Sequence, residues 1–196
     1  MRYLPAARYV AMPWRNGKGM TEEIARAPAA PADFDWRLSL AAITEDGPFS
    51  HYAGYERAVV LVSGDGFCLD VEGDGQRLLQ APGAVAVLDG ATPVHCRLTG
   101  GPCRDLSLMV RRPGTVSAAR ALDIVRPVTL GAGSATHRAL YVLQGGLQAV
   151  GAGEACPALV AGDSLLFDSD DTAVRLSPGA GAARVVLLEW LPAPGA

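Results

Sequence analysis

The feature that most constrains this chain is an internal repeat of short apolar segments that end in turns. Four blocks of the first half recur in the second half in the same order, at offsets between 78 and 81 residues. One chance match between apolar strands is common, whereas four in register indicate a duplicated supersecondary unit. The sequence therefore predicts two copies of one β-unit. The matching blocks are Arg57–Gly64 with Arg138–Gly145, Ala81–Asp89 with Val160–Asp168, Cys96–Leu98 with Val174–Leu176, and Leu106–Met109 with Val185–Leu188.

Apolar and polar residues alternate along much of the chain, which indicates half-buried strands. Phe34–Leu40 shows this alternation, and turns of Gly, Pro and Asp separate it from later segments of the same kind. Short strands at this spacing are typical of antiparallel barrels and sandwiches. Val116–Val125 departs from the pattern, because Thr115 or Ser117 is suited to a helix N-cap and Pro127 to a helix stop. We expect a modest helix there, between the two halves.

Each copy runs from a strand through a glycine turn to a second strand, and then through a Pro-Gly or Gly-Asp turn into an apolar strand. This order resembles that of cupin barrels. The resemblance implies an all-β bicupin, with two tandem cupin-like jelly-roll β-barrels and little helix, although the periodicity alone fits another small all-β barrel equally well. We expect residues 1–115 to form an N-terminal barrel with a ligand pocket. Residues 116–196 would form a C-terminal barrel that serves as scaffold or interface.

The composition disfavours several classes of protein. The formal net charge is -3 and the pI is about 5.6, which provides no basic field for the phosphates of nucleic acid. No run approaches the roughly 18 apolar residues that span a bilayer. Pro5 and Arg8 interrupt the stretch that a signal peptide would need to be apolar. We therefore expect a cytoplasmic protein that binds neither nucleic acid nor a membrane.

The spacing of cysteine and histidine gives little support for a metal or redox centre. The four cysteines form no C-x-x-C pair, and the three histidines form no His-x-His pair. His51 and His95 could recruit Glu45 or Glu56 for a facial triad, but we expect an emptied metal site and no cofactor. Hydrolase, kinase and dehydrogenase functions lack support, because the chain has no nucleophile elbow, phosphate loop or Gly-x-Gly-x-x-Gly word.

Arginines within the strands of the first unit are the first candidates for a binding site. Arg57 shares a strand face with Val59 and Leu61, so it points either toward a ligand or to the rim of the barrel. Arg37 lies on the face opposite Trp36 and looks either into the barrel or into solvent. An arginine holds a carboxylate through two parallel hydrogen bonds, which would suit an acidic ligand.

Three further polar residues join these candidates. Asn16 lies beside glycines that let backbone N–H groups approach a ligand, with a simple turn as the alternative. Asp105 and Ser107 share a strand face with Met109. Asp105 is either a general base or orienting partner in the site, or one half of a salt bridge with a neighbouring arginine.

Several segments, distributed over almost the whole chain, resemble the HutD/Ves family. They are Trp14–Ile24, Phe34–Ser39, Gly54–Arg57, His95–Leu98 and Asp105–Met109. The resemblance implies a cytoplasmic bicupin, a homodimer, and a sensing or regulatory role in histidine utilisation or stress response, with N-formylglutamate as the suggested ligand. It favours His95 as a pocket residue over a solvent-facing residue at a strand start. Two departures from the family pattern are Lys18, which interrupts a glycine-rich stretch, and Ser107, which stands in place of asparagine.

We therefore expect the first barrel to bind a small acidic metabolite, an amino-acid derivative, without breaking a bond. One alternative is a cupin-type enzyme, either an isomerase, a lyase or a metal-dependent oxygenase. Another is an interaction module whose second barrel docks a partner. The expected ligand-binding residues are Asn16, Arg37, Arg57, His95, Asp105 and Ser107.

Overall fold

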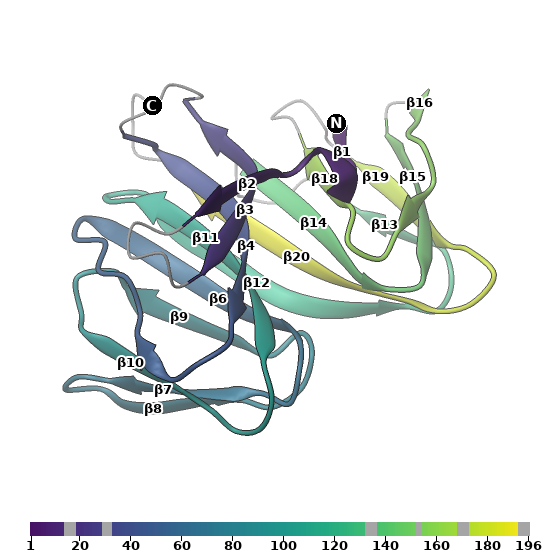
Figure 1. Ribbon diagram of the computed structural model, residues 1–196. Helices are drawn as coiled ribbons and strands as arrows, with labels where there is room; N and C mark the ends of the chain where they lie inside the picture. Colours follow the sequence, from purple (N-terminus) through teal and green to yellow (C-terminus); the bar gives the residue numbers. More distant parts are fainter. Residues whose placement is uncertain (14–18, 29–32, 132–136, 152–153, 168–172, 192–196) are drawn as a thin grey trace. The chain divides into compact units, whose positions relative to one another are not determined.

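The computed structural model describes residues 1–13, 19–28, 33–131, 137–151, 154–167 and 173–191, and strands make up most of them (Figure 1). The single helical segment within these ranges is a short 3₁₀ turn, η1 (Ala6–Arg8). The prediction of an all-β fold is thus confirmed. The strands fall into two compact units. We refer to Val10–Val116 as the N-terminal unit, and to Ser117–Leu191 together with Met1–Tyr9 as the C-terminal unit.

Two antiparallel sheets make up the N-terminal unit. The six-stranded sheet has the order β2-β3-β4-β11-β6-β9, and the four-stranded sheet has the order β5-β10-β7-β8. Neighbours such as β4 and β11 are far apart in sequence, as jelly-roll topology requires. The strands are β2 (Val10–Pro13), β3 (Met20–Ala27), β4 (Trp36–Ile43), β5 (Gly47–Pro48), β6 (Tyr55–Ser63), β7 (Phe67–Val71), β8 (Gly75–Leu79), β9 (Val85–Asp89), β10 (Val94–Leu98) and β11 (Cys103–Arg111).

Apolar side chains from both sheets form the core of the N-terminal unit. Val59 and Leu61 of β6 pack in one cluster with Phe67 and Leu69 of β7, and all four are inaccessible to solvent. Side chains two residues apart in a strand share a face. Arg57 therefore lies on the core side of β6, in line with Val59 and Leu61.

The C-terminal unit also consists of two sheets. One has the order β1-β18-β14-β20-β12, and the other has the order β13-β19-β15-β16, with β17 paired to β15. Its core includes Leu140, Val142, Val185 and Leu187. The strands are β1 (Arg2–Leu4), β12 (Thr115–Ile124), β13 (Val128–Leu130), β14 (His137–Gln144), β15 (Gly146–Gly151), β16 (Glu154–Ala155), β17 (Leu159–Val160), β18 (Ser164–Phe167), β19 (Val174–Pro178) and β20 (Ala183–Leu191).

The strand registers reproduce the sequence repeat and correct one of its blocks by a residue. In the N-terminal unit Asp105 of β11 lies opposite Leu61 of β6, and in the C-terminal unit Val185 of β20 lies opposite Val142 of β14. Both pairs of strands have a register shift next to this position. The structure thus aligns Val185 with Asp105, whereas the sequence comparison aligned it with Leu106.

The helix expected at Val116–Val125 does not form, and this prediction was wrong. The segment is strand β12, hydrogen-bonded beside β20. Charged pairs connect the two strands, because Arg120 Nη1 donates to Glu189 at 2.9 Å and Asp123 lies 3.4 Å from Arg184. Pairing within a sheet outweighs the helix propensity of its alanines, because local propensity is commonly overridden by tertiary context.

The first nine residues belong to the C-terminal unit, although the sequence analysis placed residue 1 at the start of the first barrel. Strand β1 pairs with β18, and Asp163 holds the segment that follows. The Asp163 carboxylate accepts hydrogen bonds from the Tyr3 hydroxyl, from the Ala6 N–H and from the Val160 N–H, each at 3.0 Å. Asp163 is 4% exposed, so these bonds satisfy a buried charge.

Replacing Asp163 by alanine should destabilise the C-terminal unit. The substitution removes the shared acceptor of three part-buried hydrogen bonds, so we expect the free energy of unfolding to fall by about 2–3 kcal/mol. Urea denaturation followed by circular dichroism measures the change. The matched control is Asp123→Ala, because its carboxylate is 61% exposed in its pair with Arg184. Equal losses in the two variants would contradict the anchoring role of Asp163.

Candidate functional site

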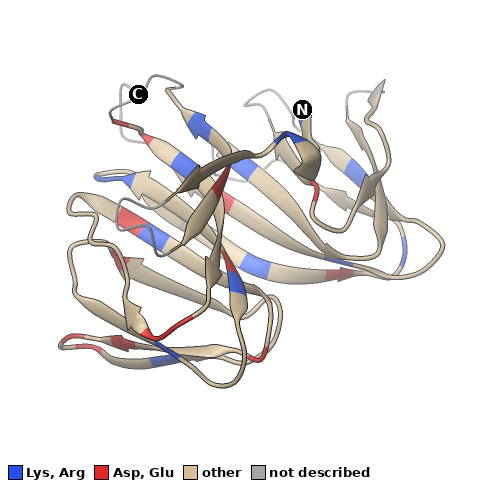
Figure 2. Cartoon of the chain, in the orientation of Figure 1, with Lys and Arg blue, Asp and Glu red and all other residues tan. Residues whose placement is uncertain are grey.

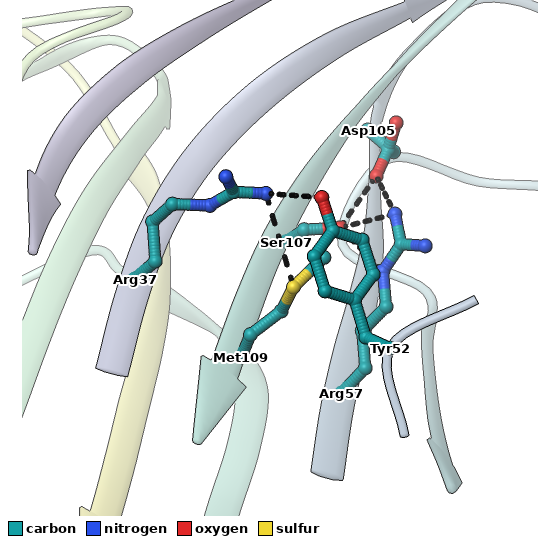
Figure 3. A network of polar contacts seen from close by, with 6 residues as sticks. All are labelled: Arg37, Tyr52, Arg57, Asp105, Ser107 and Met109. Atoms are coloured by element: carbon teal, nitrogen blue, oxygen red, sulfur yellow. Dashed lines mark hydrogen bonds and ion pairs between the residues drawn. The ribbon is translucent and has the colours of Figure 1, made fainter. Parts of the chain in front are cut away.

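Three adjacent strands of the N-terminal unit bring four of the predicted residues together. Strands β4 and β6 both pair with β11, so that Met109 lies opposite Arg37 on one side and opposite Arg57 on the other. Ser107 and Asp105 follow on the same face of β11 at two-residue spacing. Arg37, Arg57, Asp105 and Ser107 are named the polar cluster, and the face that carries them is named the inner face (Figure 3).

Arg57, Ser107 and Asp105 form a closed network inside the unit (Figure 3). Arg57 Nε and Nη2 donate to Ser107 Oγ at 3.0 and 2.8 Å, and Ser107 Oγ donates to Asp105 Oδ2 at 2.9 Å. Arg57 Nη2 also lies 3.6 Å from Asp105 Oδ2. Asp105 is fully buried and Arg57 is 8% exposed. The network therefore holds a guanidinium charge in the interior, next to its counter-charge.

Burial dominates the ionisation of this pair. Desolvation lowers the pKa of Arg57 and raises the pKa of Asp105, while the attraction between the two charges opposes both shifts. The neighbouring positive charge of Arg37 lowers the pKa of Arg57 further. Arginine still remains protonated in proteins. The polar cluster therefore carries two positive charges and at most one negative charge.

Arg37 is the arginine of the polar cluster that has no carboxylate partner within the described residues. It is half-buried, and no carboxylate within the described ranges forms an ion pair with it. Its Nη2 donates to the Tyr52 hydroxyl at 3.2 Å and lies 3.9 Å from Met109 Sδ. Its Nε is buried and has no hydrogen-bond partner among the same residues.

Aromatic rings surround the two guanidinium groups. The Arg37 guanidinium lies 4.9 Å from the ring centre of Phe34 and 5.5 Å from that of Tyr52. The Arg57 guanidinium lies 4.4 Å from the ring centre of Phe49. Such contacts stabilise a cation without neutralising its charge.

The sequence analysis did not assign these rings to the site. Phe34 stands in one of the words that resemble the family, which was the available signal for it. Phe49 and Tyr52 lie in the connection between β5 and β6, where no strand periodicity shows which way a side chain points.

The C-terminal unit has no equivalent of the polar cluster at the matching strand positions. Val185 and Leu187 occupy the places of Asp105 and Ser107, and both belong to the apolar core. Arg138 corresponds to Arg57, but its Nη1 donates to the Gly131 carbonyl at 2.6 Å and its guanidinium lies over Phe167. The network of arginine, serine and aspartate at these strand positions is therefore a feature of the N-terminal unit. Acidic and basic positions are otherwise interspersed along the strands of each unit (Figure 2).

The other two predicted residues do not join the polar cluster in the structure. Asn16 lies outside the described residues. His95 is exposed on β10 between Val94 and Cys96, which are buried in the core, so its side chain points to the opposite face of the four-stranded sheet. With His51, Asp70 and other residues it lines an open hollow of about 720 Å³.

A much smaller cavity lies beside Arg57. It measures about 10 Å³ and is lined by Phe49, Ser50, Arg57, Asp89 and neighbouring residues. This volume corresponds to roughly one water molecule. A metabolite could therefore touch Arg57 only after Phe49 or its neighbours move, whereas Arg37 is half-buried and does not line this cavity.

Cupins often hold a metal ion, and the side chains described here do not fit one. Within the described ranges no group of three His, Cys, Asp or Glu side chains is arranged to hold a metal. His51 Nε2 is 2.8 Å from the carbonyl oxygen of Ala91, and His95 faces away from the core. We therefore assign no metal chemistry to the polar cluster.

The architecture and its inner face define a protein of the cupin-like class. A cupin 2 conserved barrel domain protein from Leptotrichia buccalis shares the fold with a TM-score of 0.60 at 10% identity, over 91% of each chain. Within this class the chain belongs to the HutD family, whose model matches residues 6–185. The resemblance noted in the sequence is thus confirmed.

Solved structures of relatives agree with this assignment. A conserved protein of unknown function from Pseudomonas aeruginosa PAO1 superimposes with a TM-score of 0.87 at 32% identity, covering 97% of this chain and 98% of that one. HutD from Pseudomonas fluorescens SBW25 superimposes with a TM-score of 0.77 at 30% identity, with the same coverage.

The curated relatives match a shorter part of the chain. An uncharacterized 21.2 kDa protein in the hutC 3′ region of Pseudomonas putida is 44% identical over 110 residues, which are 56% of this chain and 57% of that protein. Protein Ves of Citrobacter koseri is 32% identical over 124 residues, 63% of this chain and 64% of Ves. The matched region thus spans less than two thirds of either relative. No helix in the described part of the chain is long and apolar enough to cross a membrane.

Replacing Asp105 by asparagine should destabilise the N-terminal unit. The change keeps the shape of the side chain but leaves the Arg57 guanidinium buried without its counter-charge, so we expect a loss of about 3–5 kcal/mol. Denaturant titration of the pure protein measures this loss. The control is Asp70→Asn, which breaks an exposed pair with Arg97 and should change stability little. An Asp105→Asn protein as stable as the control would show that Arg57 needs no buried counter-charge.

Proposed function

We propose that the N-terminal unit binds a small carboxylate-bearing metabolite at Arg37, with Arg57 as the second positive charge. The observation that carries this proposal is the half-buried Arg37 guanidinium, which has no carboxylate partner among the described residues. Two guanidinium groups close enough to repel each other share one carboxylate in the polar cluster. An anion that binds to Arg37 offsets the repulsion between the two guanidinium groups.

The groups around Arg37 suit a carboxylate. Its buried Nε is without a partner in the described part of the chain, and a carboxylate that accepts from Nε and a terminal nitrogen makes the two parallel bonds typical of arginine. The Tyr52 hydroxyl accepts from Arg37 Nη2, which leaves its own proton to donate to the ligand. Phe34 and Tyr52 provide an apolar wall that excludes water and strengthens these charged hydrogen bonds.

The proposed role is recognition of the metabolite, with no bond broken. Family membership supports a sensing or regulatory protein of histidine utilisation or stress response, and N-formylglutamate is the first ligand to test. The relative from P. putida lies in the hutC 3′ region, which agrees with that context. The proposal includes a cytoplasmic location and a homodimer, as the family resemblance implies.

A thermal-shift screen tests this function directly. A ligand that binds only the folded protein, at a hundred times its Kd, stabilises it by about 2.7 kcal/mol. For a chain of this size that corresponds to a rise in Tm of roughly 5–10 °C. We expect such a rise with N-formylglutamate or another acidic intermediate of histidine degradation. A flat melting temperature with every acidic amino-acid derivative at millimolar concentration would contradict the proposal.

The variant Arg37→Gln should reduce this shift strongly. Losing a charged hydrogen-bond donor costs about 1.5–3 kcal/mol, so the affinity should fall by one to two orders of magnitude. Arg97→Gln is the control, because Arg97 pairs with Asp70 on the exposed face of the four-stranded sheet. Isothermal titration calorimetry on both variants measures the ratio of affinities. Equal binding by the two would place the ligand away from Arg37.

A further inference from the structure

A β-bulge in β3 places two charged residues on the inner face beside the polar cluster. Glu23 lies opposite Ser39 of β4, and Arg26 lies opposite Arg37, with a register shift between these two positions. Residues three apart in a regular strand point to opposite faces. Because the bulge inserts an extra residue, both side chains project from one face. The bulge thus places both Glu23 and Arg26 on the face of the sheet that carries Arg37.

Glu23 offers an acceptor that the described residues do not use. Its side chain is 16% exposed, and its Oε2 lies 3.5 Å from Arg26 Nη1, an ion pair that is too long for a good hydrogen bond. Oε2 is buried and receives no hydrogen bond from the described part of the chain. A buried carboxylate oxygen without a donor costs free energy, which a donor on a bound molecule would recover.

The inner face therefore presents an unused acceptor on β3 and an unused donor on the adjacent strand β4. Arg37 Nε has no acceptor and Glu23 Oε2 has no donor within the described ranges, and the two residues lie on neighbouring strands. A simple dicarboxylate can accept hydrogen bonds from Arg37, but it offers no donor to the Glu23 carboxylate and brings a second negative charge toward it. A molecule with an N–H group on the carbon next to its carboxylate can accept from Arg37 and also donate to Glu23.

We propose that Glu23 is a specificity-determining residue that selects carboxylates with a hydrogen-bond-donating nitrogen on the neighbouring carbon. The ligand class is then α-amino acids and their N-acyl derivatives, and simple mono- and dicarboxylates are excluded. Glu23 accepts a hydrogen bond from the right ligand and repels the carboxylate of the wrong one, so attraction and repulsion both contribute. This inference rests on the proposed function, because Arg37 must hold the carboxylate.

Matched pairs of ligands test this selection by isothermal titration calorimetry on the full chain. The first pair is L-glutamate and glutarate, which differ by the amino group. The second pair is N-formyl-L-glutamate and its N-methyl derivative, which differ by the amide N–H. In the pair that binds, we expect the member with the N–H to bind at least about tenfold more tightly, as for a hydrogen bond to a charged group.

The variant Glu23→Ala should remove this preference by weakening the N–H ligand and strengthening its analogue, because the repulsion is lost as well. A merely structural role would weaken both ligands together. Glu22→Ala is the matched control, because Glu22 is the preceding residue, lies opposite Leu40 and pairs with Arg104, away from the polar cluster. The control should keep the tenfold preference. If thermal melting shows that Glu23→Ala does not fold, Glu23→Gln removes the charge with the same shape, and loss of the L-glutamate preference is the result expected.

The outcomes separate this inference from the function on which it rests. Tight binding of both members of a pair, lost in Arg37→Gln and unchanged in the Glu23 variants, overturns the role of Glu23 and leaves the binding function standing. Failure of the wild-type chain to bind any of the four compounds overturns the proposed function, and the role of Glu23 with it.

Discussion

The charge of Arg57 in the interior of the N-terminal unit is the constraint to which the rest of the site is fitted. A guanidinium cannot be buried cheaply without a counter-charge and hydrogen-bond acceptors. Asp105 and Ser107 meet both needs, and they do so only in the register in which β6 and β11 pair. Asp105 is committed to Arg57, so Arg37 has no carboxylate partner among the residues that the structure describes. The excess of positive charge on the inner face follows from this arrangement.

Duplication explains how one chain can contain such a site and remain stable. The C-terminal unit has valine and leucine at the positions of Asp105 and Ser107, and its core is apolar there. At these positions one copy of the fold thus keeps apolar side chains, while the other copy holds polar groups whose burial costs free energy. Strained or polar interiors are common where a protein binds or reacts, and the rest of the fold compensates for them.

The sequence predicted the two-copy all-β fold because strand alternation and turn residues are local signals. Alternation also placed Arg57 on one face with Val59 and Leu61, and Asp105 and Ser107 on one face with Met109. It could not supply the strand pairing that joins them to Arg37, and it could not show that His95 points to the other side of its sheet. Alternation could not show the orientation of Phe49 and Tyr52, because they lie in a connection between strands. It could not show the orientation of Glu23 either, because a bulge breaks the period of two. The helix was mispredicted where pairing with β20 outweighed local propensity.

The docking of β1 onto β18 makes the N-terminal unit an insertion within the C-terminal one. Residues 1–9 leave the ribosome more than 150 residues before the segment with which they pair. The N-terminal unit can complete its own sheets during synthesis, while the C-terminal unit needs strands that lie on both sides of the N-terminal unit in the sequence. Deletion of Met1–Tyr9 should therefore destabilise the C-terminal unit, although most of that unit lies far from these residues along the chain.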